Sequence, residues 1–319
     1  MQRRSLLYAA AGCLGAPAWA QVALTKPVRL FVGYSAGGAV DIVARAIGQQ
    51  MQATLGQPVI VENKPGAGTN IAIKALIDSP ADGSTLMLAA NALAANVSLY
   101  QPPPYDLARD ITPISLVGRV PVVIAVASSS PVHTLAQLIA AAKAQPKALS
   151  YATPGNGSTP HLAVELFQRA AGIELMHVPY KGGAQAITDV LGGHVQSLAV
   201  NALEVLTHVK SGKLRVLAVM TPKRSGIFPE VPTVAEQGFA GFEASVWYSL
   251  VGPRGMAPAM VKLLHNAVQQ ALAAEDVKQR LAAAGGEVLP GSTEMVTNML
   301  ATERARYEKL IREARIQPD

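Results

Sequence analysis

Short apolar runs alternate with amphipathic segments along most of this chain. Residues 28–33 form an apolar run of strand length, and apolar residues then recur at three- and four-residue spacing from Val40 to Leu55. Such spacing predicts a helix, which Gly56 and Pro58 end. The order of strand, small-residue loop and helix repeats in two similar sets, so we expect an α/β protein with mostly parallel sheets flanked by helices.

Two stretches interrupt this alternation, and a helical tail follows it. Residues 100–114 are a proline-rich surface stretch, and residues 221–242 are a long irregular connection. The tail predicts helices near residues 258–273, 276–284 and 293–314. These helices are too few to form a domain of their own, so we expect them to pack on the first set.

This return makes the chain cross between two lobes twice, near residues 121–127 and 247–252. Two crossings form a hinge, and a cleft lies between lobes that are joined in this way. We therefore expect residues 21–123 and 249–319 to form the first lobe and residues 124–248 to form the second.

Composition and charge exclude several classes of protein. Half of the 319 residues are hydrophobic and 15% are charged, which suits a soluble, well-packed protein. The formal net charge is +6, but the basic residues are scattered, so we expect no nucleic-acid partner. Beyond the N-terminus no stretch is apolar for long enough to span a membrane. We expect a monomer.

The N-terminus has the pattern of a secretory signal peptide. The basic pair Arg3-Arg4 precedes an apolar run over residues 6–14, and residues 18–20 (AWA) are small at the positions that a signal peptidase reads. We expect residues 1–20 to be removed near Ala20-Gln21 and the mature protein to be periplasmic. The paired arginines leave both the general secretory route and the twin-arginine route open.

Three small-residue loops stand between a strand and a helix, which is where open α/β sheets bind ligands. They span residues 34–40, 154–160 and 180–183. Backbone N–H groups can approach a ligand closely there, and the helix dipole adds partial positive charge. The first loop has no Lys or Arg, so we expect neutral donors that hold a carboxylate and release it. For each loop alone, a tight turn without a ligand is the alternative.

Catalytic and metal chemistry receive less support from the residues. Ser158 and His161 suit a nucleophile and a base, but the glycine of a nucleophile elbow is missing after Ser158. The stretch over residues 66–72 (GAGTNIA) lacks the third glycine of a dinucleotide fingerprint, and the histidines share no metal-ligand spacing. We expect no enzyme, no cofactor and no metal. A cleft hydrolase or transferase that uses Ser158 and His161 is the alternative.

Two further pairs of residues have two readings each. Asp41 and Arg45 lie four apart on the first predicted helix, where they form either a surface ion pair or a brace for the preceding loop through its backbone amides. Trp247 and Tyr248 lie on the second crossing, where we favour packing at the hinge over stacking on a ligand.

Seven motifs occur in the order found in one protein family. They are GYSAGGAVDIVAR, VENKPGAGTNIAIKAL, PADGSTLML, YATPGNGSTPHLAVELF, VPYKGGAQAITDVLGG, GKLRVLAV and PEVPTVAEQG. On these motifs the chain resembles the substrate-binding proteins of the tripartite tricarboxylate transporter system, the Bug or TctC family. The resemblance covers essentially the whole mature chain.

The resemblance implies a two-lobed periplasmic binding protein of the Venus-flytrap kind, type II-like, with two mostly parallel sheets and a two-strand hinge. Such a protein captures a small organic acid between its lobes and delivers it to a two-component membrane permease. A signalling receptor that presents its closed form to a membrane sensor is the other reading. Which carboxylate is bound stays open.

The resemblance also implies a set of ligand-binding residues. They are Tyr34, Ser35, Ala36, Gly37 and Gly38 in the first lobe, Gly157, Ser158, Thr159 and His161 opposite them, and Asn91, Tyr180 and Asp189. Many relatives carry acidic residues where this chain has Gln196 and Val200. We therefore expect a substrate with an amino group to lose support at that wall, and an apolar or aromatic acid to gain some.

Overall fold

The computed structural model describes residues 23–283 and 286–318. The expected signal peptide, residues 1–20 with its cleavage site, lies outside the described residues. Within the part of the chain that is described, no helix combines the length and the apolar character needed to cross a membrane.

The first lobe is built on three parallel strands. Strands β2, β1 and β3 lie side by side in that order, with Val28 opposite Val59 and Arg29 opposite Thr85. Three helices and one 3-10 turn accompany them. The bounds are β1 (Val28–Val32), α1 (Ala39–Leu55), β2 (Val59–Asn63), η1 (Ala67–Thr69), α2 (Asn70–Ile77), β3 (Thr85–Ala89) and α3 (Ala92–Leu99).

Helix α1 follows the predicted apolar spacing. Val43, Ile47 and Met51 are buried along one face of the helix. Gly56 ends the helix in the left-handed conformation, with φ of 64°, and its N–H donates to the carbonyl of Gln52. The sequence thus places the N-terminus of α1 directly after β1, at the carboxyl end of a buried strand.

The second lobe repeats this plan. Strands β7, β5 and β6 are parallel neighbours, with Tyr151 opposite Ser197 and Ser150 opposite Met176. The bounds are α5 (Leu135–Ala144), β5 (Ser150–Thr153), α6 (Thr159–Ala171), β6 (Met176–Pro179), α7 (Gly183–Leu191), β7 (Ser197–Asn201), α8 (Ala202–Lys210), β8 (Leu214–Val219) and η2 (Ala235–Gln237).

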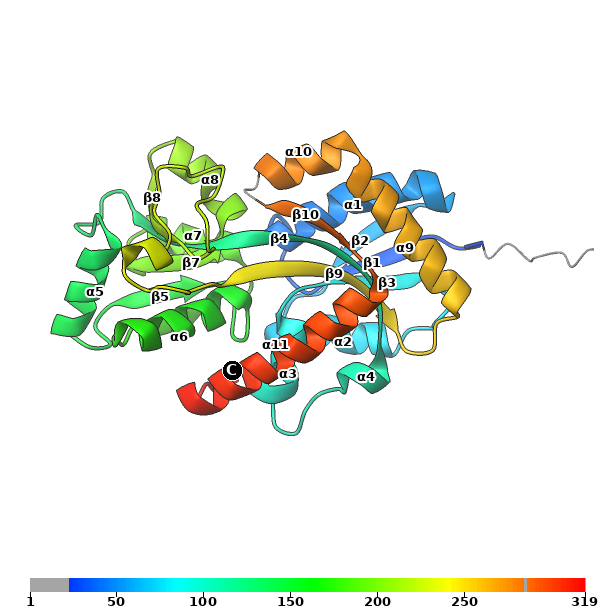
Figure 1. The fold of residues 1–319 in the computed structure, drawn as a ribbon, viewed down its shortest axis with the longest axis horizontal. Coiled ribbons are helices and arrows are strands. Elements are labelled where there is room, and N and C mark those ends of the chain that lie inside the picture. The colour runs from blue at the N-terminus through cyan, green and yellow to red at the C-terminus, as the bar shows by residue number, and fades with distance from the viewer. Residues whose placement is uncertain (1–22, 284–285, 319) are drawn as a thin grey trace, which may run out of the picture.

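Two long strands, β4 (Ile111–Ala127) and β9 (Ser245–Pro253), run between the lobes (Figure 1). They pair with each other in antiparallel fashion, and β9 also pairs with β3 while β4 pairs with β7 and β8. The sheets are therefore parallel at their outer strands but antiparallel at the crossings, whereas mostly parallel sheets were expected. The lobe boundaries after residues 123 and 248 stay a prediction.

The C-terminal helices lie against the first lobe. Helix α9 (Pro258–Ala273) packs on α1 and α11 (Thr293–Ala314) packs on α3, with α10 (Glu275–Ala283) beside α9 (Figure 1). Strand β10 (Glu287–Gly291) was not predicted, because a five-residue segment that ends in Pro-Gly shows little alternation. It pairs with β4. The short helix α4 (Leu107–Asp110) and the start of β4 occupy the expected surface stretch.

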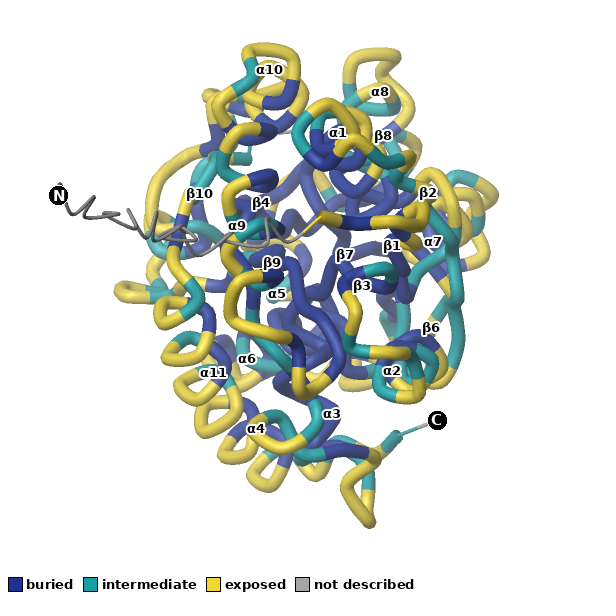
Figure 2. Tube along the Cα trace, turned by 90° about the vertical axis from the view of Figure 1, so that its right-hand side faces the viewer, coloured by how far each residue is buried: buried dark blue, intermediate teal, exposed yellow. Residues whose placement is uncertain are grey.

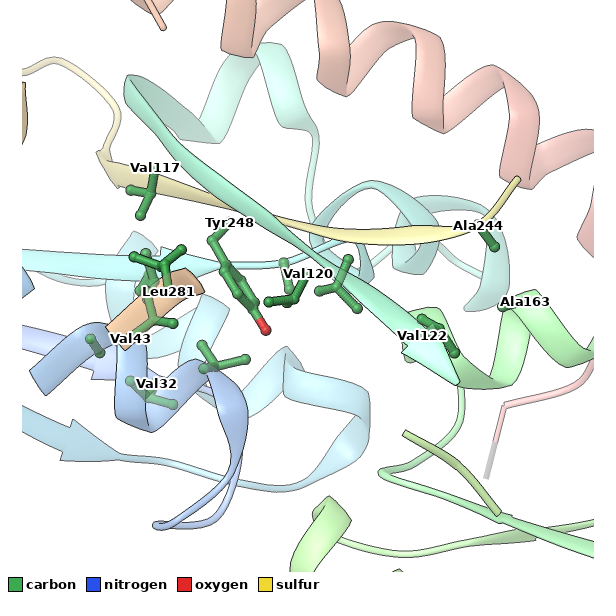
Figure 3. Close-up of a cluster of buried hydrophobic side chains, with 14 of the residues drawn as sticks. Val32, Val43, Val117, Val120, Val122, Ala163, Ala244, Tyr248 and Leu281 are labelled. Atoms are coloured by element: carbon green, nitrogen blue, oxygen red, sulfur yellow. The ribbon is translucent and has the colours of Figure 1, made fainter. Parts of the chain in front are cut away.

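The strands form the buried centre, and the helices expose their outer faces (Figure 2). In the first lobe, Tyr248 reaches from β9 into a cluster that includes Val32, Val43, Val120 and Leu281 (Figure 3). The crossing strand is thus held by the core on which α1 and α10 also pack.

Candidate ligand-binding cleft

Two adjoining cavities lie between the lobes, and both are lined by Tyr34, Pro154 and Ser158. The Glu204 cavity has a volume of about 20 Å³. Its lining is Tyr34, Gly38, Ala39, Val40, Ala90, Pro154, Ser158, Thr159, Pro160, Gly182, Gly183, Asn201, Glu204 and Val246. The Lys181 cavity has a volume of about 110 Å³, and Gly66, Thr69, Asn156, Tyr180 and Lys181 are among its lining residues.

Four helices begin at the Glu204 cavity. Helix α1 starts after Gly38, α6 after Ser158, α7 after Gly182 and α8 after Asn201, and all four of these N-cap residues line the cavity. Each helix N-terminus carries roughly half a positive charge. Among the described residues that line this cavity, none is Lys or Arg. The cavity therefore suits an anion although no cationic side chain lines it.

Asp41 holds the first-lobe loop in place. Its carboxylate accepts hydrogen bonds from the Gly37 N–H (3.0 Å), from Arg45 Nε (3.0 Å) and from Asn63 Nδ2 (3.0 Å). Asn63 Nδ2 also donates to the Tyr34 carbonyl (3.0 Å). Burial raises the pKa of Asp41, but these hydrogen bonds and the Arg45 charge outweigh it, so the net pKa is lowered. Asp41 thus forms the ion pair and also braces the loop.

Ser158 and His161 organise the second-lobe loop and are not bonded as nucleophile and base. Ser158 Oγ donates to the Gly155 carbonyl (2.6 Å) and caps α6 by accepting the His161 N–H (3.4 Å). His161 Nδ1 accepts the Gly157 N–H (3.1 Å), which requires this nitrogen to be unprotonated. The His161 ring stacks on His177 at 3.9 Å, and burial lowers its pKa. The imidazole therefore supports the loop.

The lobes touch each other across the cleft. Ser35 Oγ donates to the carbonyl of Lys181 at 2.9 Å, and the Ala39 N–H donates to Glu204 Oε1 at 3.3 Å. Gly157 lies against Asn96 and Leu99 of α3, so closely that an added Cβ would be 2.8 Å from Leu99. The structure is therefore a closed form.

Glu204 is the site residue that sequence analysis missed. Its Oε1 accepts the Ala39 N–H and Asn201 Nδ2 (2.8 Å), and its Oε2 lies so close to Gly183 that an added Cβ there would be 1.4 Å away. Burial raises the pKa of Glu204, although the hydrogen bonds from Asn201 and Ala39 lower it in part. An acidic residue in the first turn of a helix that follows a buried strand was the available signal.

Several predicted residues line the cavities. Tyr34, Gly38, Ser158 and Thr159 line the Glu204 cavity, and Tyr180 lines the Lys181 cavity. Ser35, Ala36, Gly37 and Gly157 are not in either lining and belong to the loops that form these walls.

Asn91, His161 and Asp189 lie outside both linings. Asn91 Oδ1 accepts the Trp247 N–H (3.1 Å), and its Nδ2 donates to Tyr307 Oη (2.8 Å), so its amide joins β9 to α11. Its contact with a ligand stays a prediction. Asp189 accepts the hydroxyl of Tyr180 (2.5 Å), which lines the Lys181 cavity.

The expected apolar wall at Gln196 and Val200 is absent from the described cavity linings. Val200 is fully buried on β7 opposite Val123, and Gln196 Oε1 accepts hydrogen bonds from Ser150. The side chains of β7 alternate between faces, and the wall that was assigned to Val200 is formed by Glu204 one helical turn later. Over the described residues, no group of three or more His, Cys, Asp or Glu could hold a metal.

Comparison with known proteins identifies the family. A family model described as "Tripartite tricarboxylate transporter family receptor" matches residues 43–316. The chain belongs to this receptor family. Protein BugT of Bordetella pertussis is 36% identical over 309 residues, which cover 96% of this receptor and 95% of BugT. The "UPF0065 protein in tcbD-tcbE intergenic region" of Pseudomonas sp. strain P51 is 33% identical. The alignment covers 92% of this receptor and 87% of that protein.

Solved structures show the same fold. The periplasmic binding protein BugD has a TM-score of 0.88 at 30% identity and covers 93% of this receptor and 100% of its own chain. R. palustris Rpa4515 with adipate has a TM-score of 0.88 at 34% identity, with coverage of 92% and 99%. MatC from Rhodopseudomonas palustris with bound malate has a TM-score of 0.86 at 28% identity, with coverage of 90% and 99%. The resemblance and the two-lobed α/β fold are thereby confirmed.

Proposed function

We propose that this receptor closes its two lobes around a small organic acid in the periplasm and delivers the acid to a membrane permease. The observation that carries the proposal is the convergence of four helix N-termini on one buried cavity with no cationic side chain in its lining. The similar structures that contain adipate and malate support a carboxylate as the ligand class.

The strength of this grip follows from the helices. An anion at a helix N-terminus gains about 0.3–1 kcal/mol, so α1, α6 and α7 together supply roughly 1–3 kcal/mol, while the start of α8 faces its own Glu204 carboxyl group. Thr159 adds a hydroxyl that is buried and has no partner among the described residues. A carboxylate that fills this position gains donors without a buried ion pair, which would cost about 3–5 kcal/mol to break. Such a site suits a carrier that must release its cargo.

Binding requires the lobes to part and close again. The Glu204 cavity of about 20 Å³ has room for about one water molecule, so the lobes must lie further apart than in this structure when an organic acid occupies it. The crossings β4 and β9 are the segments that join the lobes and would bend. A ligand that contacts both lobes favours the closed state by its difference in affinity for the two states.

Export, delivery and the lack of catalysis complete the proposal. The signal-peptide pattern over residues 1–20 supports a periplasmic location, and family membership supports a permease as the partner. Ser158 donates to the Gly155 carbonyl and His161 accepts from the Gly157 backbone, so the pair that would serve a hydrolase or transferase is engaged elsewhere.

A thermal-shift screen of the mature protein tests the proposal. The panel contains dicarboxylates, tricarboxylates, acidic amino acids, aromatic acids and neutral sugars. A ligand at 100 times its Kd stabilises the folded state by about 2.7 kcal/mol, which raises Tm by several degrees. We expect at least one carboxylate to raise Tm, and NMR to recover it unchanged after incubation. A response to sugars alone, or conversion of the acid, would overturn the proposal.

A further inference from the structure

The Glu204 cavity contains buried acceptors that have no donor. Asn201 Oδ1 and Glu204 Oε2 are buried side-chain oxygens, and neither has a hydrogen-bond partner within residues 23–283 and 286–318. They belong to one turn at the start of α8, where Asn201 Nδ2 donates to Glu204 Oε1 at 2.8 Å. A buried acceptor without a donor is costly, so this wall favours a ligand that brings a donor.

The same cavity contains donors of the opposite kind. The N-termini of α1, α6 and α7 reach it, and the unpartnered hydroxyl of Thr159 lies in its lining. A carboxylate satisfies these groups. The cavity therefore has groups for an anion and, on α8, groups for a hydrogen-bond donor. A second carboxylate placed against Glu204 would face a buried like charge.

Glu204 Oε2 is buried, although the residue as a whole is partly exposed, and burial raises the Glu204 pKa. Tyr248 is buried and Tyr34 is half-buried, and burial first and the Glu204 charge second raise the pKa of both hydroxyls. A cationic group at Oε2 would stabilise the charged form of Glu204 and so oppose the effect of burial on its pKa.

We propose that Glu204 selects a ligand that carries a protonated amino group as well as its carboxylate, and disfavours the acid that lacks the amino group. The inference rests on the proposed function and specifies its substrate class. The carboxylate contacts the helix N-termini and Thr159, while the ammonium donates to Glu204 Oε2 and Asn201 Oδ1. This proposal reverses the expectation drawn from Val200, because the Val200 side chain is in the core and the Glu204 side chain lines the cavity.

Calorimetry with matched ligand pairs tests the inference. The pairs are succinate and aspartate, glutarate and glutamate, propionate and alanine, and 3-phenylpropionate and phenylalanine, which differ within each pair only in the amino group. A charge-assisted hydrogen bond in a buried site corresponds to roughly a tenfold or larger difference in Kd. For the pair that binds most tightly, we expect wild type to favour the amino acid by at least about tenfold.

Two variants assign the preference to its residue. Glu204→Gln keeps the shape of the side chain and removes its charge, and we expect it to lose the preference while it still binds the unsubstituted acid. Glu294→Gln is the matched control, because Glu294 is exposed in the first turn of α11 and lies outside both cavity linings. This control should keep the wild-type preference.

Each result distinguishes the two proposals. Equal binding of both members of the pair by wild type, or a preference that survives in Glu204→Gln, would overturn the role of Glu204 and leave a carboxylate receptor. If none of these acids and none in the thermal screen binds, the proposed function fails and the inference fails with it. The comparison of ligand pairs on wild type needs no variant, so it holds even if Glu204→Gln folds poorly.

Discussion

Gly183 is the position at which the smallest change should disturb closure. In the closed structure an added Cβ at Gly183 would lie 1.4 Å from Glu204 Oε2 and 2.6 Å from the Glu204 carboxyl carbon. The Gly183→Ala substitution therefore forces the Glu204 side chain out of its position, where it accepts hydrogen bonds from Ala39 of the first lobe and from Asn201. The backbone itself tolerates alanine, because Gly183 is the first residue of α7 and has no positive φ.

The expected magnitude has two parts of opposite sign. Overfilling a packed site costs about 1–3 kcal/mol, and moving Glu204 away also breaks its hydrogen bond from Ala39 of the first lobe, which only the closed form makes. Kd for the ligand should therefore rise by roughly 5- to 150-fold. Replacing glycine by alanine at a tolerated backbone position stabilises the fold by about 0.4–1 kcal/mol, which offsets part of the overfilling cost in the ligand-free protein, because Gly183 and Glu204 both belong to the second lobe. Calorimetry measures the first effect and urea unfolding the second.

A double-mutant cycle shows whether Glu204 is the group that collides. In a Glu204→Ala background the Gly183→Ala change meets no carboxyl group, so it should cause no further loss of affinity. Gly226→Ala is the control, because an added Cβ at Gly226 meets nothing within 4 Å. Wild-type affinity in Gly183→Ala, or the same loss in both backgrounds, would refute the reasoning.

Three further predictions concern the loops around the cleft. Asp41→Asn should lower the free energy of unfolding by about 1–3 kcal/mol at pH 7, and the difference should shrink as the pH falls below about 3.9 and vanish only below the lowered pKa of the folded state; equal differences at pH 3 and pH 7 in urea unfolding would contradict this. Burial lowers the pKa of His177 to about 4, so the unfolded state binds the proton first as the pH falls from about 6.5. His177 should contribute about 2 kcal/mol to the stability that wild type loses between pH 7 and pH 5, with buried His161 adding to the loss, so His177→Gln should lose measurably less in the same assay. Thr159→Val removes a buried hydroxyl that has no partner in the described structure, so Tm should stay the same or rise. Calorimetry should show roughly tenfold weaker binding of the acid, and unchanged affinity would exclude the hydroxyl from the site.

Periodicity predicted the elements that bury a regular face. Helix α1 appears where the spacing from Val40 to Leu55 placed it, and the loops at residues 34–38 and 154–160 stand at the ends of buried strands. Strand β10 escaped prediction because its pairing with β4 comes from contacts distant in sequence, which a short local pattern does not encode.

The candidate site was predictable at its backbone and less so at its side chains. Small residues between a strand and a helix can be recognised from the local sequence, so Gly38 and Ser158, which line the Glu204 cavity, were among the predicted residues. The contacts of Asn91 and the place of Glu204 in the cavity lining could not be predicted, because both depend on the partner that reaches the side chain. Asn91 meets Tyr307 and Glu204 meets Ala39, each from a segment more than 150 residues away, and only the folded lobes bring these pairs together.

The central claim is that helix N-termini without a cationic side chain hold the carboxylate of the ligand. The most direct test compares, by calorimetry, the best-binding acid with its primary amide, which has the same shape and no charge. The N-termini of α1, α6 and α7 contribute roughly 1–3 kcal/mol to an anion, so the amide should bind about 5- to 150-fold more weakly. Equal affinity of the acid and the amide would contradict the account.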